Sequence, residues 1–212
     1  MKKLVLSAAV LAIFTGGMTA AVSVAAPETA MACPIGTQKS AAVAKKLPQV
    51  NYRDHGKHVL ALQLALRVEG YTYLKGTGNY AGETLRAVKD YQRKHHIKDS
   101  GIVGPKTWQA LVGTKSTKVT GGTLEKVKPF SLNPGERGGE RLDNLYNMLQ
   151  RISPYAAELD TLNDHSGVYG PGLQKMVRDF QKRAGIKASG IVGPKTVSAM
   201  NEVIAVAGQW GC

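Results

Sequence analysis

The sequence predicts an all-α chain with two small three-helix modules in tandem, joined by linkers and preceded by an N-terminal signal segment. The first observation is an internal repeat, in which residues 78–111 align without gaps to residues 167–200 and share sixteen of 34 positions. The shared positions include an unbroken octapeptide, SGIVGPKT, at 100–107 and 189–196. The second observation is that apolar residues recur at helical spacing in both copies. A chain of 212 residues is long enough for two small domains.

The repeat and the composition between its copies divide the chain into six segments. The stretches that match neither copy contain Gly121-Gly122, Pro129, Pro134 and scattered lysines, a composition typical of linkers. We expect a signal peptide at 1–25, a linker at 26–50, module 1 at 51–113, a linker at 114–136, module 2 at 137–203 and a tail with a terminal cysteine at 204–212.

Each module is expected to form three short helices. In module 1 the segment 57–68 is apolar on nearly every face, and the second helix places Leu85, Val88 and Tyr91 on one stripe. Module 2 has six extra residues between its first helix and its Gly-x-Tyr turn, at about 153–166. We expect them to lengthen the loop there.

The octapeptide predicts a tight turn that leads into the third helix of each module. Gly101 and Gly190 are suited to a positive φ at this turn. The Ile and Val that follow are expected to pack inward as a short extended piece. Pro105 and Pro194 are placed to occupy the first position of the third helix, as Pro171 is for the second helix of module 2.

The N-terminus predicts export of the protein. Residues 1–3 read Met-Lys-Lys, and no charge occurs from 4 to 26, the pattern of a secretory signal. Small residues place cleavage after Ala25, with a second option after Ala32. A lipoprotein modified at Cys33 and an uncleaved membrane anchor are the alternatives. Export makes a secreted or extracellular location the prediction, and it largely removes nucleic acid as a partner.

The charge balance indicates a polyanionic partner, a membrane surface or an acidic polymer, without distinguishing between them. Lys and Arg number 28 against 15 Asp and Glu, a formal net charge of +13. A hydrophobic fraction of 43% excludes an ordinary disordered chain. The two cysteines, Cys33 and Cys212, are predicted to pair in an oxidising compartment, and free or intermolecular thiols are the alternative.

The repeated unit resembles the bacterial peptidoglycan-binding domain. The residues that carry the resemblance are Leu-Gln in the first helix, Gly-x-Tyr, a second helix that ends in Tyr-Gln or Phe-Gln, and Gly-Ile-Val-Gly-Pro-Lys-Thr. The resemblance covers 51–113 and 137–203. It implies a three-helix module that binds cell wall and usually accompanies a hydrolase. Val197 stands in module 2 where module 1 has Trp108, and the first loop is longer, so we expect module 1 to dominate binding.

Catalytic and metal sites are not predicted. The five histidines lack metal-ligand spacing, and neither cysteine lies in a nucleophile signature. The expected function is therefore a secreted, non-catalytic protein that binds bacterial peptidoglycan through two modules, with no cofactor, no metal and no stable membrane association after signal cleavage. The alternatives are a small cell-wall hydrolase with a cryptic site and a secreted protein-interaction module.

The candidate ligand-binding residues are basic or aromatic positions shared by the two copies, together with one tryptophan. A basic stripe recurs on the second helix at i, i+3 and i+7, and we expect it to attract peptidoglycan carboxylates or anionic wall polymers. A solvated helix face is the alternative for the stripe, core packing is the alternative for Trp108, and Gln92 and Gln181 are expected either to bond to the turn or to contact ligand. The predicted set is Tyr80, Arg86, Lys89, Arg93, Lys106, Trp108, Tyr169, Lys175, Arg178, Lys182 and Lys195.

Overall fold

The computed structural model describes residues 41–113, 126–152, 155–162 and 166–207. The helices of these ranges lie in the unit Cys33–Cys212. The described ranges contain helices and isolated β-bridges but no strand, which confirms the all-α prediction. The predicted signal peptide and the predicted pairing of Cys33 with Cys212 fall outside the described residues and remain predictions.

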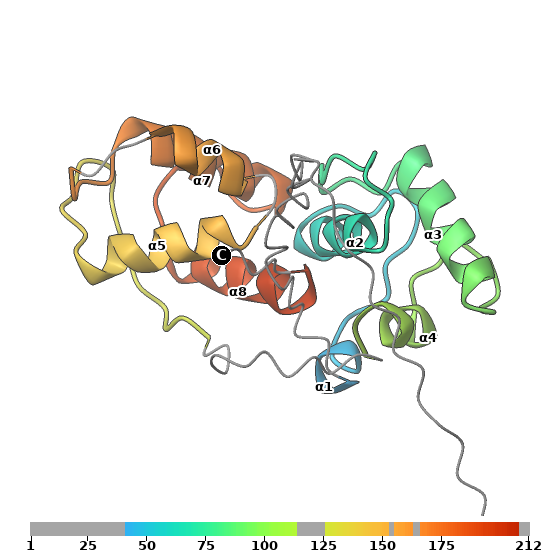
Figure 1. The fold of residues 1–212 in the computed structure, drawn as a ribbon. Coiled ribbons are helices and arrows are strands. Elements are labelled where there is room, and N and C mark those ends of the chain that lie inside the picture. The colour runs from blue at the N-terminus through green and yellow to red at the C-terminus, as the bar shows by residue number, and fades with distance from the viewer. Residues whose placement is uncertain (1–40, 114–125, 153–154, 163–165, 208–212) are drawn as a thin grey trace, which may run out of the picture. The chain divides into compact units, whose positions relative to one another are not determined.

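Module 1 contains the three predicted helices (Figure 1). They are α2 (Lys57–Val68), α3 (Gly82–Lys94) and α4 (Pro105–Trp108), and α4 continues as a π-helical turn, η1 (Gln109–Gly113). A short helix, α1 (Ala41–Ala44), lies in the predicted N-terminal linker and packs against η1. The buried face of α2 is broad because α3 and η1 of module 1 and α8 (Pro194–Ala207) of module 2 all pack against this helix, which accounts for its nearly continuous apolar sequence.

Module 2 has one helix more than expected. It contains α5 (Glu140–Gln150), α6 (Tyr155–Leu162), α7 (Pro171–Arg183) and α8 (Pro194–Ala207). Helix α6 forms within the segment at about 153–166, which contains the six extra residues and which we expected to be a longer loop, and it packs against α5 and α7. Pro171 begins α7, as predicted.

An equivalent β-bridge ties each module together, so the sequence repeat is also a repeat of backbone contacts. Val50 pairs with Val103 in module 1, and Leu132 pairs with Val192 in module 2. All four side chains are fully or almost fully buried. Val50 and Leu132 were expected in linkers, and they belong to the packed core.

A buried glutamine holds the octapeptide turn in each module. The Gln92 amide donates to Ile102 O at 2.8 Å and to Thr107 Oγ1 at 3.0 Å, and its oxygen accepts from Gly101 N at 3.0 Å. The Gln181 amide makes the same three bonds at 2.8, 3.0 and 2.9 Å. This confirms the interpretation of the two glutamines as residues that bond to the turn.

The turn corrects one expectation. Val103 is fully buried, as expected, but Ile102 points outward and is 44% exposed, and Ile191 in module 2 is equally exposed. The reason is the alternation of side chains in extended backbone: when Val103 faces the core, its neighbour must face away.

The two modules pack against one another through α2 and α8. Arg183, at the end of α7, donates to Gly76 O at 3.0 Å, and Lys57 N donates to Ala184 O at 3.1 Å. Lys57 Nζ lies 2.8 Å from Glu202 Oε2 of α8. At Gly78, a Cβ would collide with the carbonyl oxygen of Arg183, so this contact requires glycine.

We predict that Gly78→Ala lowers the free energy of unfolding more than Gly167→Ala does. The two glycines are equivalent in the repeat and have similar positive φ values of 73° and 68°, so the backbone strain of an alanine is matched. Only at Gly78 does the new Cβ meet the other module, which adds about 1–3 kcal/mol of overpacking. Urea unfolding of both variants measures the difference, and equal losses would contradict the contact between modules.

Candidate functional site

The predicted basic stripe of module 1 lies on the exposed side of α3. Arg86 and Arg93 are exposed and Lys89 is half-buried, whereas Val88 and Tyr91 of the same helix are buried. The spacing i, i+3, i+7 produces this arrangement because it keeps the three cations on one side of a 3.6-residue helix. The structure therefore brings Arg86, Lys89 and Arg93 together.

Acidic neighbours leave part of this stripe unpaired. Asp90 Oδ2 lies 2.7 Å from Lys94 Nζ, and Arg93 is 3.6 Å from Asp90 and 3.8 Å from Asp99. Arg86 and Lys89 make no ion pair within the described ranges. These two cations are the free charge of the stripe.

A groove runs beside the stripe and adds aromatic rings to it. The groove has a volume of about 800 Å³, and we call it the tyrosine groove. Tyr73 is 49% exposed and meets Tyr71 edge to face, with ring centroids 6.3 Å apart. The tyrosine groove is lined by Glu69, Gly70, Tyr71, Tyr73, Arg86, Lys89, Asp90, Arg93 and Lys94.

One hydrogen-bonded carboxylate fixes the floor of the tyrosine groove. Tyr71 Oη donates to Asp90 Oδ2 at 2.8 Å, and Lys94 Nζ lies 5.2 Å from the centre of the Tyr71 ring. The hydrogen bonds from Lys94 and Tyr71 lower the pKa of Asp90, so it stays ionised. Tyr71 is thereby held in place, and Tyr73 presents its ring to solvent.

In module 2 the corresponding surface is partly covered. Tyr155 Oη donates to Asp179 Oδ2 at 2.8 Å, which repeats the bond of Tyr71, but Tyr155 is itself the first residue of helix α6. Glu158 of α6 lies 3.9 Å from Lys175 of the stripe. A Cβ at Gly172 would lie 2.5 Å from Leu162 of α6, which explains the glycine at that position.

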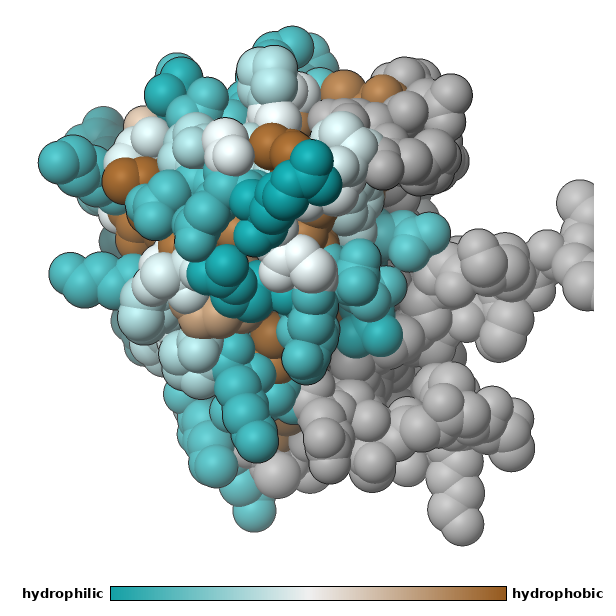
Figure 2. All heavy atoms as spheres, turned by 90° about the vertical axis from the view of Figure 1, so that its left-hand side faces the viewer, coloured by the Kyte–Doolittle hydropathy of each residue, from teal (hydrophilic) through white to brown (hydrophobic). Residues whose placement is uncertain are grey.

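The rest of the module 2 stripe remains accessible. Arg178 and Lys182 are exposed, as is Lys175 beside α6. Figure 2 shows a face that is largely hydrophilic, with apolar side chains only in small separate spots. Module 2 thus keeps its cations, but α6 occupies the position next to them.

The aromatic residues predicted to contact ligand lie in the core. Tyr80 Oη donates to Gly101 O at 2.5 Å, and Tyr169 Oη donates to Gly190 O at 2.6 Å. Trp108 is fully buried, and its indole donates to Pro48 O at 2.8 Å. Burial raises the pKa of both tyrosines, which keeps their hydroxyls as donors. The core alternative for Trp108 is confirmed, and none of the three offers a ring face at the surface.

Tyr73 is a candidate that the sequence reasoning missed. It lies in the loop between α2 and α3, outside the aligned part of the repeat, so the comparison of copies did not reach it. Tyr71 is buried and Tyr73 is exposed because residues 72 and 73 form a turn, in which Leu74 N donates to Tyr71 O at 3.1 Å. The spacing of the two tyrosines alone gives no signal of which ring faces outward.

Two further predicted lysines lie on other helices. Lys106 is exposed in the first turn of α4, and Lys195 is exposed in the first turn of α8. The structure places neither in the tyrosine groove. Lys195 instead lines a pocket of about 690 Å³ between the modules.

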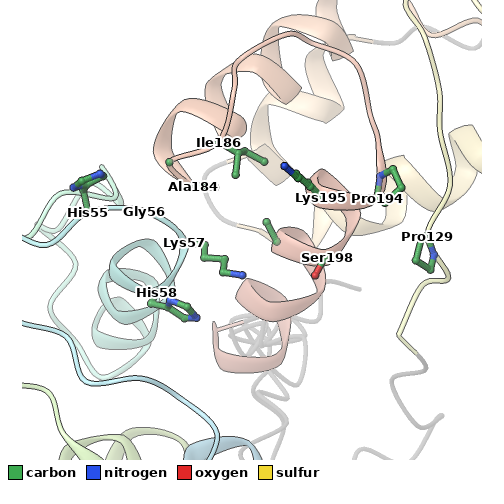
Figure 3. A pocket seen from close by; sticks show the side chains of 12 residues that line it. His55, Gly56, Lys57, His58, Pro129, Ala184, Ile186, Pro194, Lys195 and Ser198 are labelled. Atoms are coloured by element: carbon green, nitrogen blue, oxygen red, sulfur yellow. The ribbon is translucent and has the colours of Figure 1, made fainter.

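The pocket between the modules carries polar side chains on both of its walls. Figure 3 shows Lys57 pointing from α2 toward α8, with Lys195 on the opposite wall. Glu202 is within 2.8 Å of Lys57 and 3.4 Å of His58 Nε2. Burial and the nearby Lys57 lower the pKa of His58 below its ordinary 6.5, against the attraction of Glu202.

Within the described residues, no three His, Cys, Asp or Glu side chains come together in a way that could hold a metal ion. Among the helices of the described ranges, none has both the length and the apolar character that crossing a membrane requires.

We predict that acid destabilises the fold through His58. Below about pH 6.5 the unfolded chain takes up a proton at this residue, whereas the folded chain does so only at lower pH, so stability falls as pH falls through that window. His58→Gln should flatten this slope in urea titrations between about pH 7.5 and about pH 5. His55→Gln, at an exposed histidine of the same pocket, is the control, and an unchanged slope in His58→Gln contradicts the prediction.

Known proteins share the repeated unit of this chain. The model of the peptidoglycan binding domain family matches residues 55–111 and 138–200. The chain is 33% identical over 154 residues to a Bacillus licheniformis protein named probable N-acetylmuramoyl-L-alanine amidase, covering 68% of this chain and 42% of the relative. It is 29% identical over 158 residues to N-acetylmuramoyl-L-alanine amidase CwlL of the same organism, covering 70% and 44%. The chain spans less than half the length of both relatives.

Proposed function

Because the chain belongs to the peptidoglycan-binding domain family, we propose that it is a secreted, non-catalytic protein that attaches to the bacterial cell wall through its two modules. The observation that carries the proposal is the tyrosine groove of module 1, where an exposed aromatic ring and unpaired cations lie side by side. The open groove also supports module 1 as the stronger binding site.

The chemistry of the groove fits a wall polymer. An exposed ring such as that of Tyr73 offers an apolar face on which a sugar can stack, with polar groups beside it. Arg86 and Lys89 have no acidic partner in the described ranges, so they can meet carboxylates of peptidoglycan or phosphates of other anionic wall polymers. Because the groove is exposed to solvent, we expect both the Tyr73 ring and the two cations to contribute to affinity.

The proposal gives the two modules different weights. In module 2 the side chains of α6 lie against Gly172 and Lys175, next to the stripe. A ligand there has to displace or avoid this helix, whereas in module 1 the corresponding surface is a groove. We therefore assign the main contact to module 1 and a supporting contact to module 2.

Secretion is proposed from the sequence of residues 1–25. The uncharged segment after Met-Lys-Lys supports export and removal of the signal. Export in turn supports a disulfide between Cys33 and Cys212 in an oxidising compartment. Intact-mass measurement of secreted material under non-reducing conditions tests both, because cleavage after Ala25 and loss of two hydrogens give distinct masses.

A second candidate function is hydrolysis of the wall, which the names of the two relatives favour. The test is incubation of purified sacculi with the full chain, followed by chromatography of the supernatant. The non-catalytic proposal predicts no soluble muropeptides above a heat-inactivated control. Release of muropeptides would make the protein a hydrolase and would overturn this part of the proposal.

We predict that replacing Arg86, Lys89 and Arg93 with Gln weakens co-sedimentation with sacculi about tenfold and flattens its dependence on salt. Three exposed ion pairs of about 0.5 kcal/mol each account for a change of this size, and salt screens such contacts. Sacculi with and without their anionic polymers separate carboxylate binding from phosphate binding.

The matched control carries Lys175→Gln, Arg178→Gln and Lys182→Gln, the equivalent positions of module 2. We expect it to lose less affinity, since α6 lies next to that stripe. Equal binding by the wild type and the module 1 variant would show that the stripe is a solvated helix face that does not contact the wall. A wild-type chain that stays in the supernatant would refute wall binding itself.

A further inference from the structure

Each module has a tight four-residue turn before its first helix, and the two turns have the same hydrogen bonds. In module 1 the turn begins at Asn51, whose carbonyl accepts from Asp54 N at 3.0 Å and whose N–H donates to Asp54 Oδ2 at 2.7 Å. In module 2 it begins at Asn133, whose carbonyl accepts from Glu136 N at 3.1 Å and whose N–H donates to Glu136 Oε2 at 2.7 Å. The two turns are therefore equivalent in backbone and in side-chain support.

The third residue of each turn adopts the left-handed conformation. Arg53 has φ of 75° and Gly135 has φ of 83°. Each donates its N–H to the carbonyl of a buried tyrosine, Arg53 to Tyr80 O at 3.0 Å and Gly135 to Tyr169 O at 2.9 Å. A Cβ at Gly135 would meet nothing within 4 Å, so it is the conformation, and not crowding, that favours glycine there.

Module 1 departs from the favoured sequence at both central positions of this turn. A positive φ at the third residue defines a type II turn, for which proline and then glycine are the favoured pair. Module 2 has this pair, Pro134-Gly135, whereas module 1 has Tyr52-Arg53. The fold of module 1 thus tolerates an arginine where glycine would relieve strain, and side chains held in this way tend to have a function.

Tyr52 and Arg53 form one exposed unit. Tyr52 is 48% exposed, Arg53 is exposed, and Arg53 Cζ lies 5.6 Å from the centre of the Tyr52 ring. The ring is itself held by the buried Tyr80, at a centroid distance of 6.3 Å and an interplanar angle of 82°. The cation–π contact therefore keeps the guanidinium close to a ring that is fixed to the core.

The charge of this unit is available to a partner. Arg53 makes no ion pair within the described ranges, and the neighbouring carboxylate of Asp54 is engaged by Asn51. A planar guanidinium binds a carboxylate through two parallel hydrogen bonds. Tyrosine and arginine are also the residue types that concentrate at the energetic centres of protein interfaces. Neither Tyr52 nor Arg53 lines the tyrosine groove, so the unit is separate from the proposed wall site.

We propose that the Tyr52-Arg53 turn is a docking point for a protein partner, which it recognises through an exposed Asp or Glu side chain. The guanidinium binds the carboxylate, and the phenol supplies contact area and a hydroxyl beside it. A stacked sugar needs an open aromatic face, but here the guanidinium already lies over the ring. Module 2 has neither side chain in its equivalent turn, so it lacks this docking point. The inference goes beyond wall binding and does not depend on it.

The test selects phage-displayed linear peptides on the full chain, with counter-selection on the variant Tyr52→Pro, Arg53→Gly. This variant gives module 1 the turn residues of module 2. We expect the enriched peptides to share an Asp or Glu, and a synthetic peptide of that sequence to bind wild type about tenfold more tightly than the variant, as expected for a hydrogen-bonded charge pair. Fluorescence anisotropy measures both affinities.

Three controls define the contact. Changing the acidic residue of the peptide to its amide should remove the preference for wild type. Arg53→Lys keeps the charge but not the planar fork, so its affinity should be intermediate. Lys98→Gln removes an exposed charge elsewhere in module 1 and should keep wild-type affinity.

Urea unfolding separates loss of the contact from loss of the fold. The variant Tyr52→Pro, Arg53→Gly should have a midpoint equal to or above that of wild type, because both new residues fit the turn. The reciprocal variant Pro134→Tyr, Gly135→Arg should have a lower midpoint, because it introduces the strain into module 2. A lower midpoint for the first variant contradicts the strain at Arg53 on which the proposal rests.

Three results overturn the proposal: no enrichment of peptides on wild type, enriched peptides without a carboxylate, and equal affinity of the peptide for wild type and the variant. Loss of co-sedimentation with sacculi in the variant, without a selected peptide, would make the turn a wall contact and would also overturn it. Failure of the wild type to bind sacculi refutes the proposed function and leaves the peptide result standing, so the two failures are distinguishable.

Discussion

The fold depends on one buried amide in each module. Gln92 donates to two acceptors and accepts from one donor inside the core, and in doing so it fixes the turn between α3 and α4. Leaving such a group unpaired costs about 1–3 kcal/mol, so the turn has one geometry and not several. Gln63 makes an equivalent clamp between α2 and the start of α3, accepting from Gly78 N at 2.8 Å and donating to Thr84. Two glutamines thus set the positions of three helices.

Much of this arrangement could be predicted from the sequence. The duplication located both modules, and periodic apolar residues predicted the helix at 57–68, which α2 confirms as Lys57–Val68. The face of α3 that carries Arg86 followed from its spacing. These features depend on local chemistry, which a single sequence contains.

Other features depended on contacts that have no sequence period. The outward direction of Ile102 is set by which neighbour pairs with Val50, and an apolar dipeptide does not reveal this. The packing of the modules places the Arg183 carbonyl against Gly78, and α6 formed in a segment whose only sequence signal was its length. Tyr73 lay outside the aligned repeat. Each of these needed a partner that is distant in the chain.

The packing of α2 against α8 has a consequence for the proposed binding of the wall by two modules. Flexibly linked domains each search for their own site, and the gain from linkage falls as the tether lengthens. The contacts of Arg183 and Lys57 instead hold the tyrosine groove of module 1 and the basic stripe of module 2 at a constant separation. Under the proposed function, such a pair gains avidity where the repeating units of a polymer match this separation and gains none where they do not. The interface between the modules would then select for the periodicity of the wall as well as for its chemistry.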